Sequence, residues 1–101
     1  MNQPHLEKID AQQYAISGEL TMKNVPQVAQ DTAPVIASMS GEVSIDLSQI
    51  TRADSAGLAL LIDWLRIARR ENVSLHFERL PEQLLQIVQV CDLHSVLPIN
   101  Q

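Results

Sequence analysis

The residue types that could do chemistry together lie in one segment, residues 44–64. Within it, Asp54, Ser55 and Gly57 follow a strand-like stretch and come just before an apolar helical one. Serine is a preferred N-cap, because its oxygen accepts a hydrogen bond from a backbone N–H that has no partner within the helix. Gly57 in the first turn would leave the backbone uncovered, so that another molecule could approach closely. The pattern indicates a contact point at the start of a helix.

A phosphate would also suit this position. The N-terminus of a helix is electropositive and favours anions. Phosphorylation of Ser55 would therefore be tolerated by its own helix, and it would add about two negative charges to an exposed docking point. The alternative is that Ser55 serves only as a cap, and the residues alone leave both interpretations open.

Two aspartates could be imagined as a catalytic carboxylate pair. We expect instead that Asp46 stabilises the loop after its strand, and that Asp54 accepts backbone hydrogen bonds beside the cap. Ser55 has no histidine near it in sequence that would indicate a catalytic base. The sequence thus favours a protein that is not an enzyme.

Metal and nucleotide chemistry have little support. Cys91 and His94 form a C-x-x-H pair, which is only half of a zinc site. His5 and His76 are far from that pair and from each other in the sequence and belong to different elements. We expect Cys91 to be a small core residue. The three glycines, Gly18, Gly41 and Gly57, form no phosphate-binding loop. We therefore expect no metal and no cofactor.

Strand-like and helix-like segments alternate along the chain. The pattern predicts strands at 6–9, 14–20, 43–47 and 73–77, a short edge strand at 96–99, helices at 25–39, 56–71 and 81–91, and a loop at 48–54. Asn24 can cap the first helix, whereas Pro34 should kink or break that helix just before it. Strands that alternate with helices imply an α/β fold with parallel strand pairs.

Composition bounds the class of protein. The 101 residues carry a net charge of −5, which disfavours binding to nucleic acid or to anionic lipid. One cysteine allows no intrachain disulfide, and the N-terminus lacks the basic start and apolar stretch of a secretory signal. No apolar run approaches the roughly 20 residues that span a bilayer. We expect one soluble, cytoplasmic domain over residues 1–101.

The motif resembles a known family. Asp54-Ser55-Ala56-Gly57-Leu58, after the strand stretch Ile45-Asp46-Leu47-Ser48, is similar to the signature of STAS domains, the fold of anti-sigma factor antagonists. The similarity extends to residues 18–21 and 80–84. It implies a small mixed sheet of 4–5 strands packed with 3–4 helices. It also implies that Ser55 is the regulatory residue. In the antagonists of this family, an anti-sigma factor kinase phosphorylates the residue at this position.

Residues 57–70 look most like the MlaB branch of the family, the cytoplasmic STAS subunits of phospholipid-transport ABC complexes that maintain outer-membrane lipid asymmetry. This resemblance implies that the chain binds an MlaF-like ABC ATPase, sits at the inner membrane through that complex, and supports its assembly and activity. An anti-sigma factor antagonist remains the alternative. The expected docking residues are Thr51, Arg52, Asp54, Ser55, Ala56, Gly57, Leu58, Leu60 and Trp64.

The helix after Ser55 has a wide apolar arc. At about 100° per residue, one face of this helix carries the side chains expected to pack on the sheet: Leu58, Leu61, Ile62, Leu65 and Ala68. A second apolar group, Leu60, Trp64 and Ile67, lies off that face. It could pack against neighbouring helices, or Trp64 could anchor a partner, and the sequence leaves both open.

Overall fold

The computed structural model describes residues 4–93, 95 and 97–100, and its five strands form one sheet in the order β1-β2-β3-β4-β5. The strands are β1 (His5–Asp10), β2 (Gln13–Leu20), β3 (Glu42–Ala53), β4 (Ser74–Glu78) and β5 (Ile99–Asn100), and the helices are α1 (Val25–Ala37), α2 (Ser55–Arg70) and α3 (Glu82–Val90). The β1–β2 pair is antiparallel, and the other neighbours are parallel. The predicted α/β fold with a small mixed sheet is confirmed.

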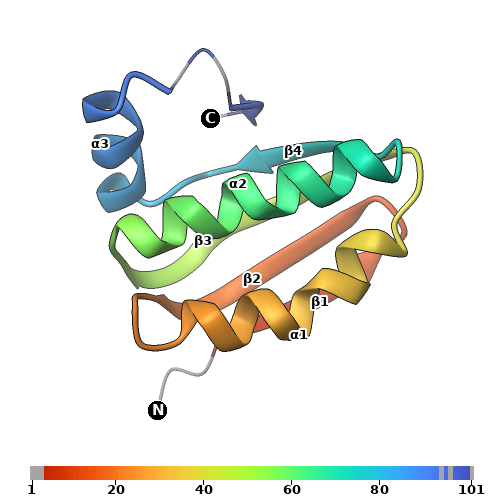
Figure 1. The fold of residues 1–101 in the computed structure, drawn as a ribbon, viewed down its shortest axis with the longest axis horizontal. Helices are drawn as coiled ribbons and strands as arrows, with labels where there is room; N and C mark the ends of the chain where they lie inside the picture. The colour runs from red at the N-terminus through yellow and green to blue at the C-terminus, as the bar shows by residue number, and fades with distance from the viewer. Residues whose placement is uncertain (1–3, 94, 96, 101) are drawn as a thin grey trace.

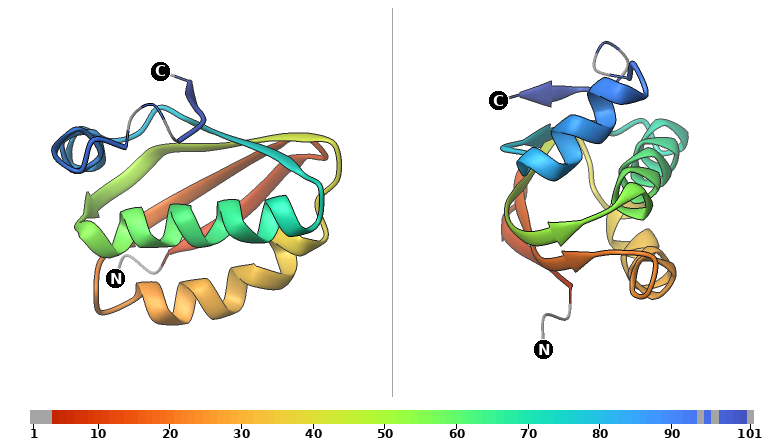
Figure 2. Two further views of the ribbon diagram at one scale, coloured as in Figure 1. Left: turned by 45° about the horizontal axis from the view of Figure 1, so that its top comes forward. Right: turned by 90° about the vertical axis from the view of Figure 1, so that its left-hand side faces the viewer.

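Helices α1 and α2 lie on one side of the sheet. A helix joins each pair of neighbouring parallel strands, and right-handed crossovers in one direction place α1 and α2 on the same face. Helices α1 and α2 lie side by side over that face, and α3 lies near the start of α2 (Figures 1 and 2). In the described part of the chain, no helix covers the opposite face.

The core lies between the sheet and the helices. Strands β2, β3 and β4 alternate, so that Ile16, Ile45 and Phe77 are fully buried while their sequence neighbours point to the open face. From α2, Trp64 packs against Phe77, with ring centroids 6.4 Å apart. Burying a side chain of this kind contributes about 1.5–3 kcal/mol, so aliphatic residues and these two rings supply most of the stability.

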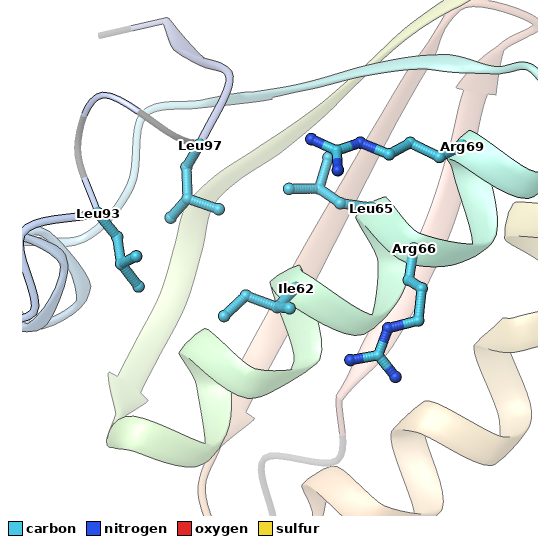
Figure 3. A pocket seen from close by; sticks show the side chains of 6 residues that line it. All are labelled: Ile62, Leu65, Arg66, Arg69, Leu93 and Leu97. Atoms are coloured by element: carbon cyan, nitrogen blue, oxygen red, sulfur yellow. The ribbon is translucent and has the colours of Figure 1, made fainter.

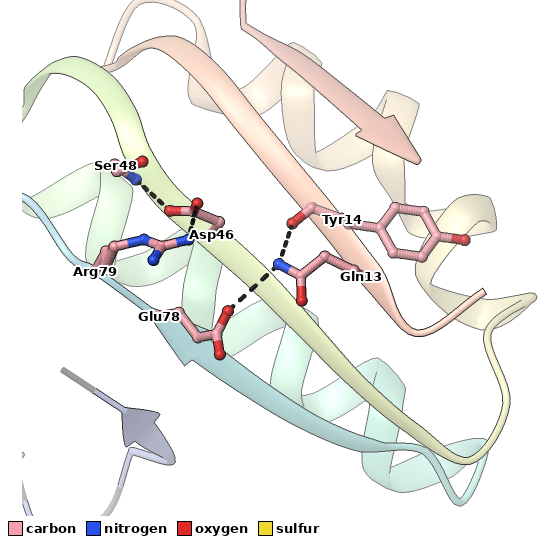
Figure 4. A network of polar contacts seen from close by, with 6 residues as sticks. All are labelled: Gln13, Tyr14, Asp46, Ser48, Glu78 and Arg79. Carbon is pink, nitrogen blue, oxygen red and sulfur yellow. Dashed lines mark hydrogen bonds and ion pairs between the residues drawn. The ribbon is translucent and has the colours of Figure 1, made fainter. Parts of the chain in front are cut away.

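The open face of the sheet is polar and carries a small network (Figure 4). The guanidinium of Arg79 donates to Asp46 over 2.6 Å, and the backbone N–H of Ser48 donates to the other carboxylate oxygen over 2.8 Å. Gln13 donates to Glu78 across the sheet. The hydrogen bond from Arg79 lowers the pKa of Asp46 despite partial burial of that carboxyl. We expected Asp46 to stabilise a loop after its strand, but Ser48 belongs to β3, so Asp46 instead accepts from a backbone N–H of its own strand and from Arg79.

Strand β3 is longer than the sequence predicts. We expected a loop over residues 48–54, but β3 continues to Ala53 and pairs with β2 as far as Leu20. Two register shifts, between Ala15 and Ser17 and between Gly18 and Glu19, interrupt the ladder. Such irregularities break the two-residue alternation, and buried residues in the second half of β3 are three positions apart. A search for alternating residues therefore does not detect this part of the strand.

Three smaller expectations also change. Helix α1 continues through the exposed Pro34 to Ala37, so the helix does not break there. The side chain of Asn24 does not cap α1 but accepts from the N–H of Thr21 and closes the preceding turn. Cys91 is exposed rather than part of the core, because α3 ends at Val90.

The end of the chain matches its prediction only in part. The edge strand expected over residues 96–99 is placed at Ile99–Asn100, and residue 96 lies outside the described residues. None of the helices in the described ranges is both long enough and apolar enough to cross a bilayer.

Candidate functional site

The expected site lies where β2 and β3 end. These strands are parallel neighbours, so the turns that lead from them into α1 and α2 meet at the same edge of the sheet. The N–H of Asp54 donates to the carbonyl of Leu20 over 3.1 Å and joins the two turns. From the start of α3, Gln83 accepts from the N–H of Ala53 over 2.8 Å. These two hydrogen bonds tie the start of α2 to the end of β2 and to the start of α3.

Asp54, not Ser55, caps α2. Its carboxylate accepts from the N–H of Ala56 over 2.8 Å and from the N–H of Met22 over 3.2 Å. Asp54 has the extended backbone typical of an N-cap, and Ser55 is the first residue of the helix. The expected backbone hydrogen bonds of Asp54 are present, but the cap was assigned to the wrong residue. Ser55 is exposed, and its hydroxyl has no hydrogen-bond partner among the described residues.

Gly57 does not leave the backbone open. It is buried, and a Cβ at this position would lie 3.2 Å from a methyl carbon of Leu84 and 3.3 Å from both Cβ and the carbonyl oxygen of Leu20. The glycine therefore allows the chain's own β2 and α3 to pack closely on the first turn of α2. The expectation that another molecule approaches here is wrong.

The apolar members of the expected docking set are also covered. Leu58, Leu60 and Trp64 are 6%, 1% and 0% exposed. The indole N–H of Trp64 donates to the hydroxyl of Thr32 on α1 over 2.8 Å, and that hydroxyl donates to the carbonyl of Val28. Trp64 belongs to the α1–α2 interface within the chain and cannot anchor a partner without unpacking the core.

The remaining expected residues reach the surface at this edge. Thr51, Arg52 and Ser55 are exposed, and Asp54 and Ala56 are half-buried. The hydroxyl of Thr51 donates to the carbonyl of Gly18 over 3.3 Å, which joins β3 to β2. The structure thus keeps the polar half of the predicted docking set at the surface and places its apolar half in the core.

Sequence reasoning missed the turn after β2. Met22 is 74% exposed, and Met22 and Lys23 line a shallow hollow of about 320 Å³ that also includes Arg52 and Asp54. The signal was available, because the carboxyl ends of neighbouring parallel strands must meet. We call the exposed residues Met22, Lys23, Thr51, Arg52 and Ser55 the Ser55 edge. It offers one apolar side chain, two cations and two hydroxyls, a set suited to contact with a protein.

The fold is that of a STAS domain. The family described as "Mlab, STAS domain" matches residues 7–98, and the chain belongs to it. A chain of the Acinetobacter MlaFEDB complex in an ATP-bound conformation is similar, with 31% identity and a TM-score of 0.77 over 88% of this chain and 94% of that one. A second structure of that complex gives 28% identity and a TM-score of 0.78.

Antagonists of anti-sigma factors are more distant relatives. The anti-sigma-B factor antagonist of Bacillus subtilis strain 168 is 24% identical over 88 residues, which cover 87% of this chain and 80% of the antagonist. The antagonist SpoIIAA in its unphosphorylated form shares the fold, with a TM-score of 0.73 and 16% identity over 97% of this chain and 88% of SpoIIAA.

Proposed function

We propose that this chain is a non-catalytic subunit of an ABC complex of the MlaFEDB kind, and that it docks on the ATPase through the Ser55 edge. Its place is then in the cytoplasm, peripheral to the inner membrane, where it supports assembly and activity of a phospholipid transporter. The observation that carries the proposal is an exposed Ser55 hydroxyl that the fold does not use, since Asp54 caps the helix. The similarity to a chain of MlaFEDB supports the type of complex.

The composition of the Ser55 edge fits an interface. Met22 is a large apolar side chain exposed at the turn, where burial against a partner would remove apolar area from water. Lys23 and Arg52 flank it on a chain whose net charge is negative, so they favour a partner with carboxylates at matching positions. Such rim charges steer association and fix orientation.

Ser55→Glu tests the proposal. A carboxylate in the first turn interacts favourably with the helix dipole, so the variant should fold at least as stably as the parent. We expect it to lose retention of the ABC ATPase from the same genome in a co-expression pull-down, because the larger charged group occupies the contact. Ser40→Glu is the matched control, since Ser40 precedes β3 and lies at the opposite edge of the sheet. Full retention by Ser55→Glu, with an unchanged melt, would refute the docking site.

An anti-sigma factor antagonist is the second candidate, favoured by the B. subtilis relative. In that role a partner kinase phosphorylates the exposed Ser55 hydroxyl. Intact-mass measurement of the protein from its native cells distinguishes the roles. One added phosphate that varies with growth state and disappears in Ser55→Ala supports the antagonist, and no phosphate under any growth condition supports the transporter subunit.

A further inference from the structure

Helix α2 borders a second surface, which lies beside its C-terminal half. An open hollow of about 330 Å³ lies between α2 and the segment that follows α3, and it is lined by Ile62, Leu65, Arg66, Arg69, Leu93 and Leu97 (Figure 3). Ile62 and Leu65 are half-buried and Leu93 is half-buried opposite them. The leucine and isoleucine side chains form an apolar floor. We call the whole hollow, with its six lining residues, the α2 groove.

The α2 groove follows the helix. Ile62, Leu65, Arg66 and Arg69 occupy positions i, i+3, i+4 and i+7, which form one stripe over two turns. A second hollow of about 240 Å³ shares Leu65 and Arg69 and continues to the start of β4. An elongated ligand that runs along α2 would fill this surface better than a compact one.

Two cations flank the apolar floor. Arg66 and Arg69 are exposed and have no ion-pair partner among the described residues, whereas Arg70 pairs with Glu71 and Arg79 with Asp46. Figure 3 shows that the guanidinium of Arg69 extends over Leu65, whereas the guanidinium of Arg66 points away from that of Arg69. A single anionic headgroup would meet only one of them. Carboxylates on both sides of an apolar stripe would meet both.

We propose that the α2 groove binds an amphipathic helix of a partner protein, with an apolar stripe flanked on both sides by Asp and Glu. The apolar side chains of that helix would cover Ile62, Leu65 and Leu93, and its carboxylates would pair with Arg66 and Arg69. A helix that lies along another helix needs a groove of this direction and length. The proposal does not depend on the function assigned to the Ser55 edge.

The test uses synthetic peptides and the full chain labelled with ¹⁵N. The acidic peptide has leucines at i, i+3, i+4 and i+7 flanked by glutamates, and the basic peptide has the same leucines flanked by lysines. We expect the acidic peptide to shift backbone resonances of residues 62–69, Leu93 and Leu97. The double variant Arg66→Glu/Arg69→Glu should weaken its binding by about tenfold or more, since it replaces two attractions by two repulsions.

Charge reversal makes the outcome specific. The double variant should prefer the basic peptide, and Arg70→Glu, on the same helix but outside the α2 groove, should bind the acidic peptide as the parent does. Arg66→Gln/Arg69→Gln provides a milder variant, expected to lose the salt dependence of binding. The buried Trp64 reports through its fluorescence that each variant is folded.

Three results would overturn the proposal. The first is no saturable shift in the α2 groove with the acidic peptide. The second is equal binding of the acidic and basic peptides by the parent chain. The third is that the chain binds no peptide but co-sediments with phosphatidylglycerol vesicles, and that this co-sedimentation requires Arg66 and Arg69. That result would assign these cations to a membrane surface.

Discussion

Asp54 holds two turns together through one carboxylate. One oxygen accepts from the N–H of Ala56 inside α2, and the other accepts from the N–H of Met22 in the turn before α1. A backbone N–H at a helix start has no partner within the helix, so this residue satisfies a donor that would otherwise need water. Ser55 beside it is left with an exposed hydroxyl.

The assignment of the cap gives a prediction at the residue scale. Asp54→Ala should lower the free energy of unfolding by about 1–2 kcal/mol, since it removes an N-cap and the contact to Met22. Ser55→Ala should change it by less than about 0.5 kcal/mol, as for other exposed positions. Urea denaturation followed by circular dichroism measures both. Equal losses for the two variants would mean that both side chains support the helix start.

At the scale of whole elements, the sequence predicts the order and type of every helix and strand that the structure describes. Alternation identifies β2 and β4 because every second residue of each strand is buried. It fails in the second half of β3, where register shifts disturb the alternation. Propensity likewise predicts a kink or a break at Pro34, but α1 continues through this exposed residue to Ala37.

Helix α2 shows why the candidate site was predicted only in part. A helical wheel identifies apolar faces but not what covers each face. Leu60, Trp64 and Ile67 are buried, and Trp64 bonds to α1, whereas Ile62 and Leu65 are partly exposed beside the chain's C-terminal segment. The position of α1, which depends on the sheet, decides between the two faces. At the N-terminus of α2, the sequence located the turn into the helix, but it assigned the cap to Ser55 rather than Asp54 and took the end of β3 for a loop.

The pairing of β3 with the end of β4 leads to a prediction on pH. The hydrogen bond from Arg79 holds the pKa of Asp46 below its ordinary value of 3.8. A carboxyl whose pKa is lower in the folded state stabilises the fold above the unfolded value, and this contribution is lost as pH falls through the folded value. At neutral pH, Asp46→Asn should therefore lower Tm, by at most a few degrees because Arg79 is largely exposed.

Thermal melts between neutral pH and acid below 3.8 measure this effect. The Tm difference between parent and Asp46→Asn should close as the pH falls. Arg79→Gln should show the same closing difference, and the double variant should lose little more than either single variant, because one ion pair is removed in each case. A difference that stays constant over the whole range would show that the ion pair does not stabilise β3 against β4.

At the scale of the whole molecule, the one-sided arrangement of helices decides which surfaces are available. The core occupies the helix face of the sheet, and the open face is polar and partly paired with itself through Asp46, Arg79, Gln13 and Glu78 (Figure 4). Two surfaces that combine accessible apolar side chains with exposed cations border α2. The Ser55 edge lies at its N-terminus, and the α2 groove lies beside its C-terminal half.

The separation of these two surfaces gives the last prediction. Ser55 and Arg69 are 14 positions apart on one helix, or about 21 Å along its axis at 1.5 Å per residue. Substitutions so far apart that share no contacts have additive effects. Ser55→Glu should therefore leave the affinity for the acidic peptide unchanged, and Arg66→Glu/Arg69→Glu should leave retention of the ATPase unchanged. The triple variant should lose both activities by the amounts seen separately. If Arg66→Glu/Arg69→Glu instead fails to retain the ATPase, the α2 groove belongs to the same interface as the Ser55 edge. A single rigid partner that contacts both surfaces would make their contributions to binding depend on each other.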